Sequence, residues 1–351
     1  MRYTVTLLCT ALASPAFAQV PGVMTDTPIV QSLVAQVMGD LGAPGALLDR
    51  GADPHAFQMR PSQARALASA DLVFWVGPEL TPWMERAIEG TGTEGKVVEL
   101  LGVEGVTLLE FGHGDDHGDE HALEAGHEHG EDHADGDDHA DEAEHDHDEE
   151  HTHEAGHDDS KEHAQEAGHD DSADHAHGGM DPHAWLNPEN ARLWLDVIAQ
   201  ELSAADTTNA AIYTANAAAA RAAVTTLEAD IRATLAPVGD SPIMVFHDAY
   251  GYFADYFGLN IVGTIALGDA ANPGAARLTE MRDLMTNAGV VCVFPEVNHS
   301  PAYAEIVVEG TAARLGGMLD PAGVAMNLGA GLYPQLMTDL AASIAACVTE
   351  D

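Results

Sequence analysis

The amino-acid sequence predicts an α/β protein of two lobes, each with a parallel-type sheet, joined by one long rigid helix. Short apolar runs alternate with helical stretches in both halves of the chain, which is typical of parallel sheets covered by helices. Between the halves, residues 205–236 contain neither glycine nor proline and are rich in alanine, as expected of a stiff linker helix. The remaining residues suffice for two domains of ordinary size, at 19–204 and 237–351.

In the first half, a helix is expected from Pro28 to about Met38. Asp26 or Thr27 can cap its N-terminus, and proline suits the first helical position. Further helices are expected at 62–70 and from residue 81 onward, and strands at 72–77, 97–101 and 106–111.

Also in the first half, Asn187 followed by Pro188 indicates the start of a helix that runs to about Ser203. The linker helix is expected to span about 209–235. In the second half, strands are expected at 243–246, 261–265 and 290–294, and helices at 249–257, 273–287, 301–315 and 333–347.

The N-terminus has the pattern of a signal peptide covering residues 1–18. Arg2 provides the charged region, residues 5–13 are apolar, and Ala16-Phe17-Ala18 is a typical cleavage site. Cleavage after Ala18 and export are therefore expected. No later stretch is long and apolar enough to cross a bilayer, so direct membrane insertion is not expected.

Cleavage would leave two cysteines, Cys292 and Cys347. An even pair in an oxidising compartment predicts a disulfide, and two buried thiols are the alternative. A disulfide would tie the last helix to the strand that contains Cys292.

The chain carries a formal net charge of −45, which makes nucleic acid a poor partner and favours a cationic ligand. The tract from His113 to His177, within the segment 112–179, holds 16 of the 20 histidines and 26 of the 58 acidic residues. Such a composition predicts disorder, and an acidic spacer alone has no need of histidine. We therefore expect weak secondary metal sites in the tract, formed by His113, His117, His121, His127, His129, His133, His139, His145, His147, His151, His153, His157, His163, His169, His175 and His177.

Four histidines lie outside that tract, at His55, His183, His247 and His299. Three of them stand in loops beside proline or aspartate, where open α/β sheets bind ligands at the carboxyl ends of strands. Three neutral imidazoles with water or a carboxylate suit tetrahedral zinc, whereas more carboxylates would suit Mn or Mg. The alternative is that these are unrelated loop histidines.

Several long stretches resemble the zinc-binding periplasmic proteins of ABC importers, the ZnuA type of solute-binding protein. They occur in the family's order and read GADPHAFQMRPSQARALASADLVFWVGPEL, DPHAWLNPENA, VFHDAYGYFADYFGL, NPGAARLTEMRDL, CVFPE and LDPAG. The resemblance implies two α/β lobes joined by one long helix, with a metal site in the cleft between them. It also implies a His-rich insert between the first two ligand histidines, as found here, and it fits a Cys292–Cys347 disulfide.

The resemblance places His55, His183 and His247 at the three zinc-ligand positions. Relatives that bind manganese have a carboxylate where His247 stands, so His247 favours zinc. Asp320 matches the carboxylate that completes the site in relatives; water is the alternative, because some relatives use a glutamate where this chain has Pro54.

Other residues near these positions are expected to surround the metal site without binding the ion. Glu296 is expected to line the cleft and His299 to be a surface or accessory histidine. Tyr250, Tyr252 and Phe253 are expected to pack around the site and shield it.

The sequence therefore predicts a periplasmic solute-binding protein that captures Zn(II) and delivers it to a membrane ABC permease without chemical turnover. A monomer is expected. Because imidazoles bind metals when deprotonated, binding should weaken as the pH falls through about 6.5. The alternatives are a zinc hydrolase or hydratase with three histidines and a water, the same fold importing Mn, Ni or Cu, and a His-rich storage protein. No HExxH motif supports the enzyme.

Overall fold

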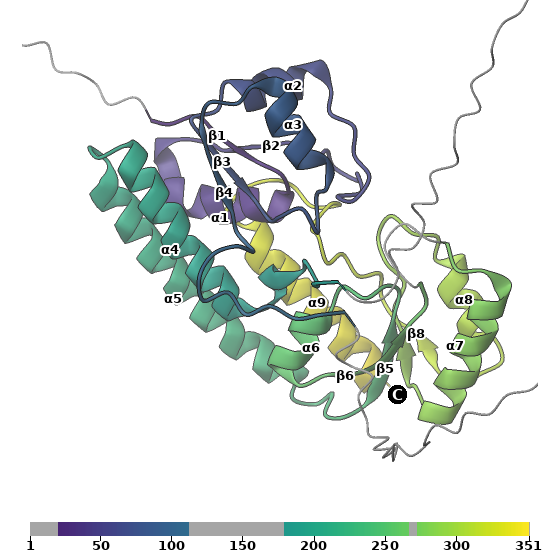
Figure 1. Cartoon of the computed structure of the whole chain (residues 1–351). Helices are drawn as coiled ribbons and strands as arrows, with labels where there is room; N and C mark the ends of the chain where they lie inside the picture. The colour runs from purple at the N-terminus through teal and green to yellow at the C-terminus, as the bar shows by residue number, and fades with distance from the viewer. Residues whose placement is uncertain (1–19, 112–178, 267–271, 351) are drawn as a thin grey trace, which may run out of the picture. The chain divides into compact units, whose positions relative to one another are not determined.

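The computed structural model describes residues 20–111, 179–266 and 272–350 of the chain. Two four-stranded sheets, all parallel, are each covered by helices, which confirms the predicted α/β class (Figure 1). The tract 113–177 and the signal segment 1–18 lie outside the described residues. None of the helices in the described ranges has the length and apolar character needed to cross a bilayer.

The first sheet has the strand order β2-β1-β3-β4, with helices on both faces. Leu72 and Phe74 of β3 point to one face, and Val73 and Trp75 to the other, as the two-residue period of a strand requires. The elements of this half are β1 (Val23–Thr25), α1 (Pro28–Met38), a 3₁₀ turn (Gly39–Leu41), β2 (Gly45–Ala46), α2 (Pro61–Ala68), β3 (Leu72–Trp75), α3 (Trp83–Thr91) and β4 (Lys96–Glu99).

The second sheet repeats this arrangement with the order β6-β5-β7-β8. Met244 of β5 packs with α7 and α8, whereas Ile243 and Val245 face the opposite core. The elements are β5 (Pro242–Val245), α6 (Gly251–Phe257), β6 (Asn260–Thr264), α7 (Ala275–Ala288), β7 (Cys292–Val293), α8 (Ala302–Val308), β8 (Arg314–Leu315) and α9 (Leu332–Thr349).

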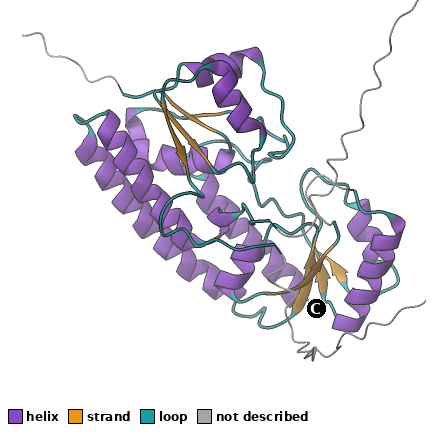
Figure 2. Cartoon of the chain, viewed as in Figure 1, coloured by secondary structure: helices purple, strands orange, loops and turns teal. Residues whose placement is uncertain are grey.

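Two long helices, α4 (Pro188–Ala205) and α5 (Ala210–Leu235), pack along each other between the sheet-forming parts of the chain (Figure 2). One continuous apolar cluster includes residues of β3, α4, α5, β5 and α9. The two sheets are therefore connected by a shared core as well as by the predicted linker helix, which is present as α5. The domain boundaries at 204 and 237 stay predictions.

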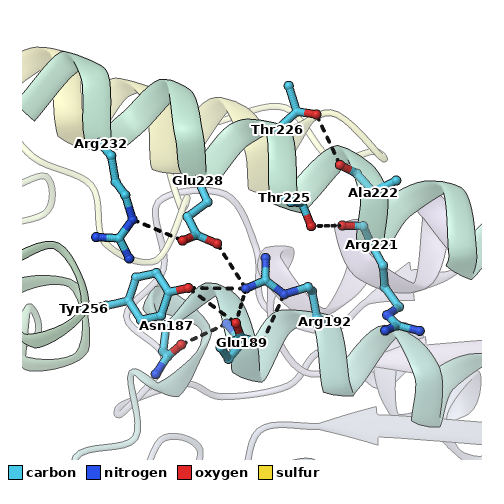
Figure 3. A network of polar contacts seen from close by, with 10 residues as sticks. All are labelled: Asn187, Glu189, Arg192, Arg221, Ala222, Thr225, Thr226, Glu228, Arg232 and Tyr256. Atoms are coloured by element: carbon cyan, nitrogen blue, oxygen red, sulfur yellow. Dashed lines mark hydrogen bonds and ion pairs between the residues drawn. The ribbon is translucent and has the colours of Figure 1, made fainter.

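A polar network reinforces this connection, and we call it the brace network: Glu189 and Arg192 of α4, Glu228 and Arg232 of α5, and Tyr256 of α6 (Figure 3). Arg192 Nη2 donates to Glu228 Oε2 at 3.1 Å and to the Tyr256 hydroxyl at 3.3 Å, and it pairs with Glu189. The Arg232 guanidinium lies 4.8 Å from the Tyr256 ring centre. Each acid of the network thus faces an arginine.

The disulfide between Cys292 and Cys347 is present, which confirms that prediction. It joins β7 to α9, although α9 also packs against α1 of the other half and against the linker helix α5. The last helix consequently fastens both halves of the chain.

Two sequence predictions about elements are wrong. Residues 106–111 form no strand, because the Thr107 backbone pairs with the Asn190 side chain and only Glu110 makes a bridge, to Met180. The predicted helix 301–315 ends at Val308: Gly310 has a φ of 77°, and Arg314–Leu315 extends the sheet as β8. The short strands β1 and β2 were not predicted from the sequence.

The chain positions on either side of the histidine tract lie next to each other. The Phe111 N–H donates to the Gly179 carbonyl at 3.0 Å, and the Asp181 N–H donates to the Leu109 carbonyl at 2.9 Å. A short turn would therefore suffice to connect the two flanking positions.

Candidate metal site

A cavity of about 260 Å³ is lined by loops from both halves of the chain. All four histidines outside the tract, together with the Asp53, Glu296 and Asp320 carboxylates, line it. None of the described residues lining the cavity is lysine or arginine, so its three carboxylates face no guanidinium or ammonium group across the cavity. Such a surface favours a cation.

His183 is almost fully buried and is fixed by Asp181. The Asp181 carboxylate accepts from the His183 ring Nδ1 at 2.7 Å and from the His183 backbone N–H at 2.9 Å. Because an ionised carboxylate only accepts, the ring donates through Nδ1 and keeps the lone pair on Nε2. This is the arrangement in which a histidine binds a metal through Nε2.

His247 follows β5 and has the same kind of partner. Its Nδ1 lies 2.6 Å from Glu296 Oε2, and the Tyr250 hydroxyl donates to the same oxygen at 3.1 Å. The side chains of His247 and Glu296 are each only 6% exposed. The contact fixes the orientation of the His247 ring through Nδ1, so Nε2 is the ring nitrogen that would bind an ion.

His55 stands in a loop after β2 that is held from two sides. The Trp83 indole donates to the Pro54 carbonyl at 2.7 Å, and the Asp53 carboxylate accepts from the His55 backbone N–H at 2.8 Å. The Gly51 N–H donates to the Val324 carbonyl at 2.8 Å, which fastens this loop to the one that contains Asp320. The half-buried His55 ring is thus placed by contacts from both halves.

The three predicted ligand histidines are neighbours in the cavity. The ring centres of His55 and His183 lie 6.3 Å apart, and those of His183 and His247 lie 5.5 Å apart. The structure therefore brings together three imidazoles that are far apart in the sequence.

Asp320 also lines the cavity, but its two carboxylate oxygens accept from the Val324 and Ala325 backbone N–H groups at 3.0 and 2.9 Å. Burial raises the pKa of this carboxyl, and the nearby Glu296 raises it further. Each oxygen has a second lone pair, so both the turn-capping role and the ligand role remain open for Asp320.

The tightest group of metal-binding side chains among the described residues consists of His247, Glu296 and His299. One ligand atom from each lies within 4.8 Å of those of the other two. His55 and His183 stand outside this group. The sequence predicted only a lining role for Glu296 and an accessory role for His299.

The residues expected to shield the site are all buried, and two of them also make polar contacts. Tyr250 donates to Glu296, and the Tyr252 hydroxyl donates to the Asp181 carbonyl at 2.9 Å. Phe253 packs in the apolar core. The role of Asp181 was missed, although an aspartate two residues before a histidine often accepts from that residue's backbone N–H.

Together, the fold and the site define a two-sheet α/β protein with a cluster of histidine and carboxylate side chains in one cavity. The chain matches the model of the ZnuA family, described as zinc-uptake complex component A, periplasmic, over residues 23–347. It belongs to this family.

Named relatives agree with this assignment. The chain is 46% identical to the high-affinity zinc uptake system protein ZnuA of Paracoccus denitrificans, over 97% of this chain and 95% of that protein. It is 36% identical to the protein of the same name from Brucella suis, over 94% and 92% of the two chains.

Solved structures share the fold. A crystal structure of ZnuA superposes with a TM-score of 0.66 at 21% identity, covering 94% of this chain and all of that one. The Mn²⁺ complex of the solute-binding protein FpvC from Pseudomonas aeruginosa gives a TM-score of 0.68 at 21% identity, covering 94% and 99%.

Proposed function

We propose that this chain is a periplasmic protein that captures Zn(II) with high affinity and delivers it to a membrane ABC permease. The ion is bound by His55, His183 and His247, and Asp320 or a water molecule is the fourth ligand. The family and the names of the relatives support zinc uptake, and the site geometry supports these ligands.

One observation carries the ligand assignment: His183 and His247 both direct Nδ1 to a buried carboxylate, and their rings are neighbours. Each ring then presents Nε2 in the correct tautomer, with its orientation already fixed. Adding the His55 imidazole gives three nitrogen ligands, which is a common set for tetrahedral zinc.

The number of imidazoles supports zinc over manganese or magnesium, which prefer oxygen ligands. Solved relatives of this fold include complexes with Mn²⁺ and Ni²⁺, so the metal needs its own test. In a competition titration, we expect Zn²⁺ to displace Mn²⁺ completely. Equal retention of Mn²⁺ would contradict the zinc assignment.

The ligand assignment is tested by zinc titration of the mature protein against a competing chelator. His55→Ala, His183→Ala and His247→Ala should each lower the affinity of the tight site by at least about 100-fold, since each removes a ligand. Gln335→Ala, an exposed polar residue of α9, is the control and should leave it unchanged. A tight site that survives any of the three histidine substitutions would contradict the proposal.

Transport without catalysis is supported by the family of uptake proteins. The alternative is a zinc hydrolase or hydratase, because three histidines and a water also describe catalytic zinc. An ester-hydrolysis and hydration assay of the zinc-loaded protein separates the two. Turnover that disappears in His247→Ala would replace the transport assignment.

The histidine tract is proposed to collect additional ions weakly and to increase the supply to the cavity. Deleting residues 114–178 leaves two residues, 112 and 113, between Phe111 and Gly179, which is the length of a tight hairpin turn. This variant should keep the one tight site but lose total zinc capacity and take up zinc more slowly when zinc is limiting. Unchanged capacity and uptake would contradict this role.

The chain is proposed to be exported and cleaved after Ala18, consistent with the periplasmic family. The mass of the mature protein isolated from the periplasm should correspond to a chain that begins at Gln19. A retained N-terminal segment would contradict it.

A further inference from the structure

We propose that His247, Glu296 and His299 form a second binding position for a divalent metal ion, built entirely from the C-terminal half of the chain. This inference rests on the proposed function, because the second position shares His247 with the three-histidine site. It assigns to Glu296 and His299 a direct role in binding the ion.

The fold places these three residues at one edge of the second sheet. His247 comes two residues after β5 and Glu296 three residues after β7, and these parallel strands are direct neighbours. Glu296 is further held by a bridge to Leu319. The carboxyl ends of parallel strands meet at the same edge, which explains why residues 49 positions apart touch.

His299 is brought back toward Glu296 by a tight turn. Asn298 has a φ of 73°, a left-handed conformation that asparagine tolerates, and the His299 N–H donates to the Glu296 carbonyl at 3.3 Å. The His299 ring stacks on Phe246, with 4.3 Å between ring centres and 25° between their planes. The imidazole orientation is therefore restrained by packing.

The separation between Glu296 and His299 suits an ion better than a hydrogen bond. His299 Nε2 lies 4.0 Å from Glu296 Oε1, which is too long for a hydrogen bond. A tetrahedral metal bonds imidazole nitrogen and carboxylate oxygen at about 2.0–2.2 Å, which places the two ligand atoms about 3.3–3.6 Å apart, so the two side chains would approach by about 0.5 Å around an ion. The other oxygen of Glu296 already accepts from Tyr250 and His247.

The chemistry of this set suits a first-row transition metal. Two imidazoles and one carboxylate form a known type of zinc site and leave a fourth position for water. The Glu296 side chain is only 6% exposed, and the described residues that line the cavity include no lysine or arginine. A bound ion would supply positive charge next to this carboxylate.

The two positions give the ion a path through the cavity. Because the second position needs no residue of the N-terminal half, an ion can bind there without His55 or His183. Because His247 belongs to both sets, the ion can then pass to the three-histidine site by exchanging Glu296 and His299 for those two ligands. His299 would thereby affect how fast the tight site fills.

The test uses the full mature chain carrying His55→Ala and His183→Ala, which removes two ligands of the first site and leaves the second intact. Crystals of this variant are soaked in zinc, and the ion is located by anomalous scattering, which separates the cavity from any zinc held by the tract. We expect a peak within about 2.2 Å of His299 Nε2 and of a Glu296 oxygen. Its absence would overturn the proposal.

A titration of the same variant against a weak chelator provides the second measurement. Adding His299→Ala or Glu296→Gln should lower the remaining cavity affinity at least about tenfold. Glu280→Gln, an exposed carboxylate of α7 in the same half, is the control and should not. Equal affinities in all these variants would overturn the second position. The three-histidine site is judged separately, by the loss of tight binding when His55 or His183 alone is replaced.

Discussion

The metal cavity and the brace network both bring charged groups from the two halves of the chain together, but they balance charge differently. In the brace network, the Glu228 carboxylate faces Arg192 and Arg232, and the pKa of Glu228 is lowered by hydrogen bonds from these arginines and Tyr256, against the opposing effect of burial. By contrast, Glu296 of the cavity lining and the buried Asp181 beside His183 face imidazoles, and no lysine or arginine is among the described residues of the lining.

This difference indicates that the brace network stabilises the fold and that the cavity is suited to bind a cation. In the brace network each carboxylate is paired with an arginine, so the network fixes the helices with respect to each other. The cavity contains carboxylates, whose negative charge an added cation would balance, and oriented imidazoles that would bind such a cation. Changes on the brace side should therefore affect stability, and changes in the cavity should affect metal affinity.

The largest effect on stability is expected from the disulfide. Replacing both Cys292 and Cys347 by alanine opens a loop with a sequence separation of 55 residues. The chain-entropy model predicts a loss of about 4 kcal/mol in the free energy of unfolding. Urea unfolding of the metal-free protein measures it, and the number of tight zinc sites should stay at one. If the tight zinc site were lost while the free energy of unfolding stayed the same, the disulfide would serve metal binding and not stability, which would contradict the comparison.

A buried carboxylate outside the cavity provides the next test. Asp26 is fully buried, and burial raises its pKa from 3.8 to about 6, although the Thr27 and Val76 backbone N–H groups and the Thr81 hydroxyl donate to it. Between these two pH values the folded state keeps the proton and the unfolded chain releases it. The free energy of unfolding therefore falls as the pH rises from about 4 to about 6, by up to roughly 3 kcal/mol.

Asp26→Asn should remove this pH dependence. The difference in the free energy of unfolding between wild type and variant should therefore change by up to roughly 3 kcal/mol between pH 4 and pH 7. Asp40→Asn, at an exposed position of the same half, is the matched control and should show no such change. A difference that is independent of pH would mean that Asp26 is ionised throughout in the folded protein.

The contribution of the brace network is tested by comparing Arg192, which belongs to it, with Arg221, which forms an exposed ion pair outside it. Arg192→Met removes a largely buried guanidinium, and we expect a loss of about 2 kcal/mol in the free energy of unfolding, because charged hydrogen bonds to Glu228 and Tyr256 disappear. Arg221→Met breaks a pair with Asp196 in which both side chains are 47% exposed, and it should cost less than about 1 kcal/mol. Equal costs would show that burial of the network contributes nothing.

The smallest effect is expected from Asp181→Asn, which keeps an acceptor for the His183 ring but removes the charge. Zinc affinity should fall about tenfold, as is usual when a partner of a ligating histidine is changed. The chelator competition measures it, while the free energy of unfolding reports whether the fold is retained. No change in affinity would mean that the Asp181 charge does not tune His183.

The sequence predicted most of the fold because its local patterns were strong. Pro28 after Thr27 marked the start of α1, and Thr27 does cap that helix. The helix that was expected to run to Leu315 shows the limit: β8 is only two residues long, and it forms because β7 is there to pair with it. Pairing between distant segments leaves no local signal in so short a strand.

For the site, residue type and family resemblance indicated which histidines to choose, and the structure brings His55, His183 and His247 to one cavity. The carboxylate partners could not all be predicted. The contact between Glu296 and His247 depends on which strands are neighbours in the second sheet, and the stacking of His299 on Phe246 depends on a turn beyond β7. Such pairings are properties of the fold and not of any one motif.

The central claim is that three distant imidazoles bind one ion. A crystal structure of the mature protein with one equivalent of zinc, with the ion located by its anomalous signal, tests it most directly. We predict a single main peak in the cavity at about 2.0–2.1 Å from one ring nitrogen each of His55, His183 and His247. A main peak elsewhere, or one that contacts fewer than three of these rings, would contradict the account.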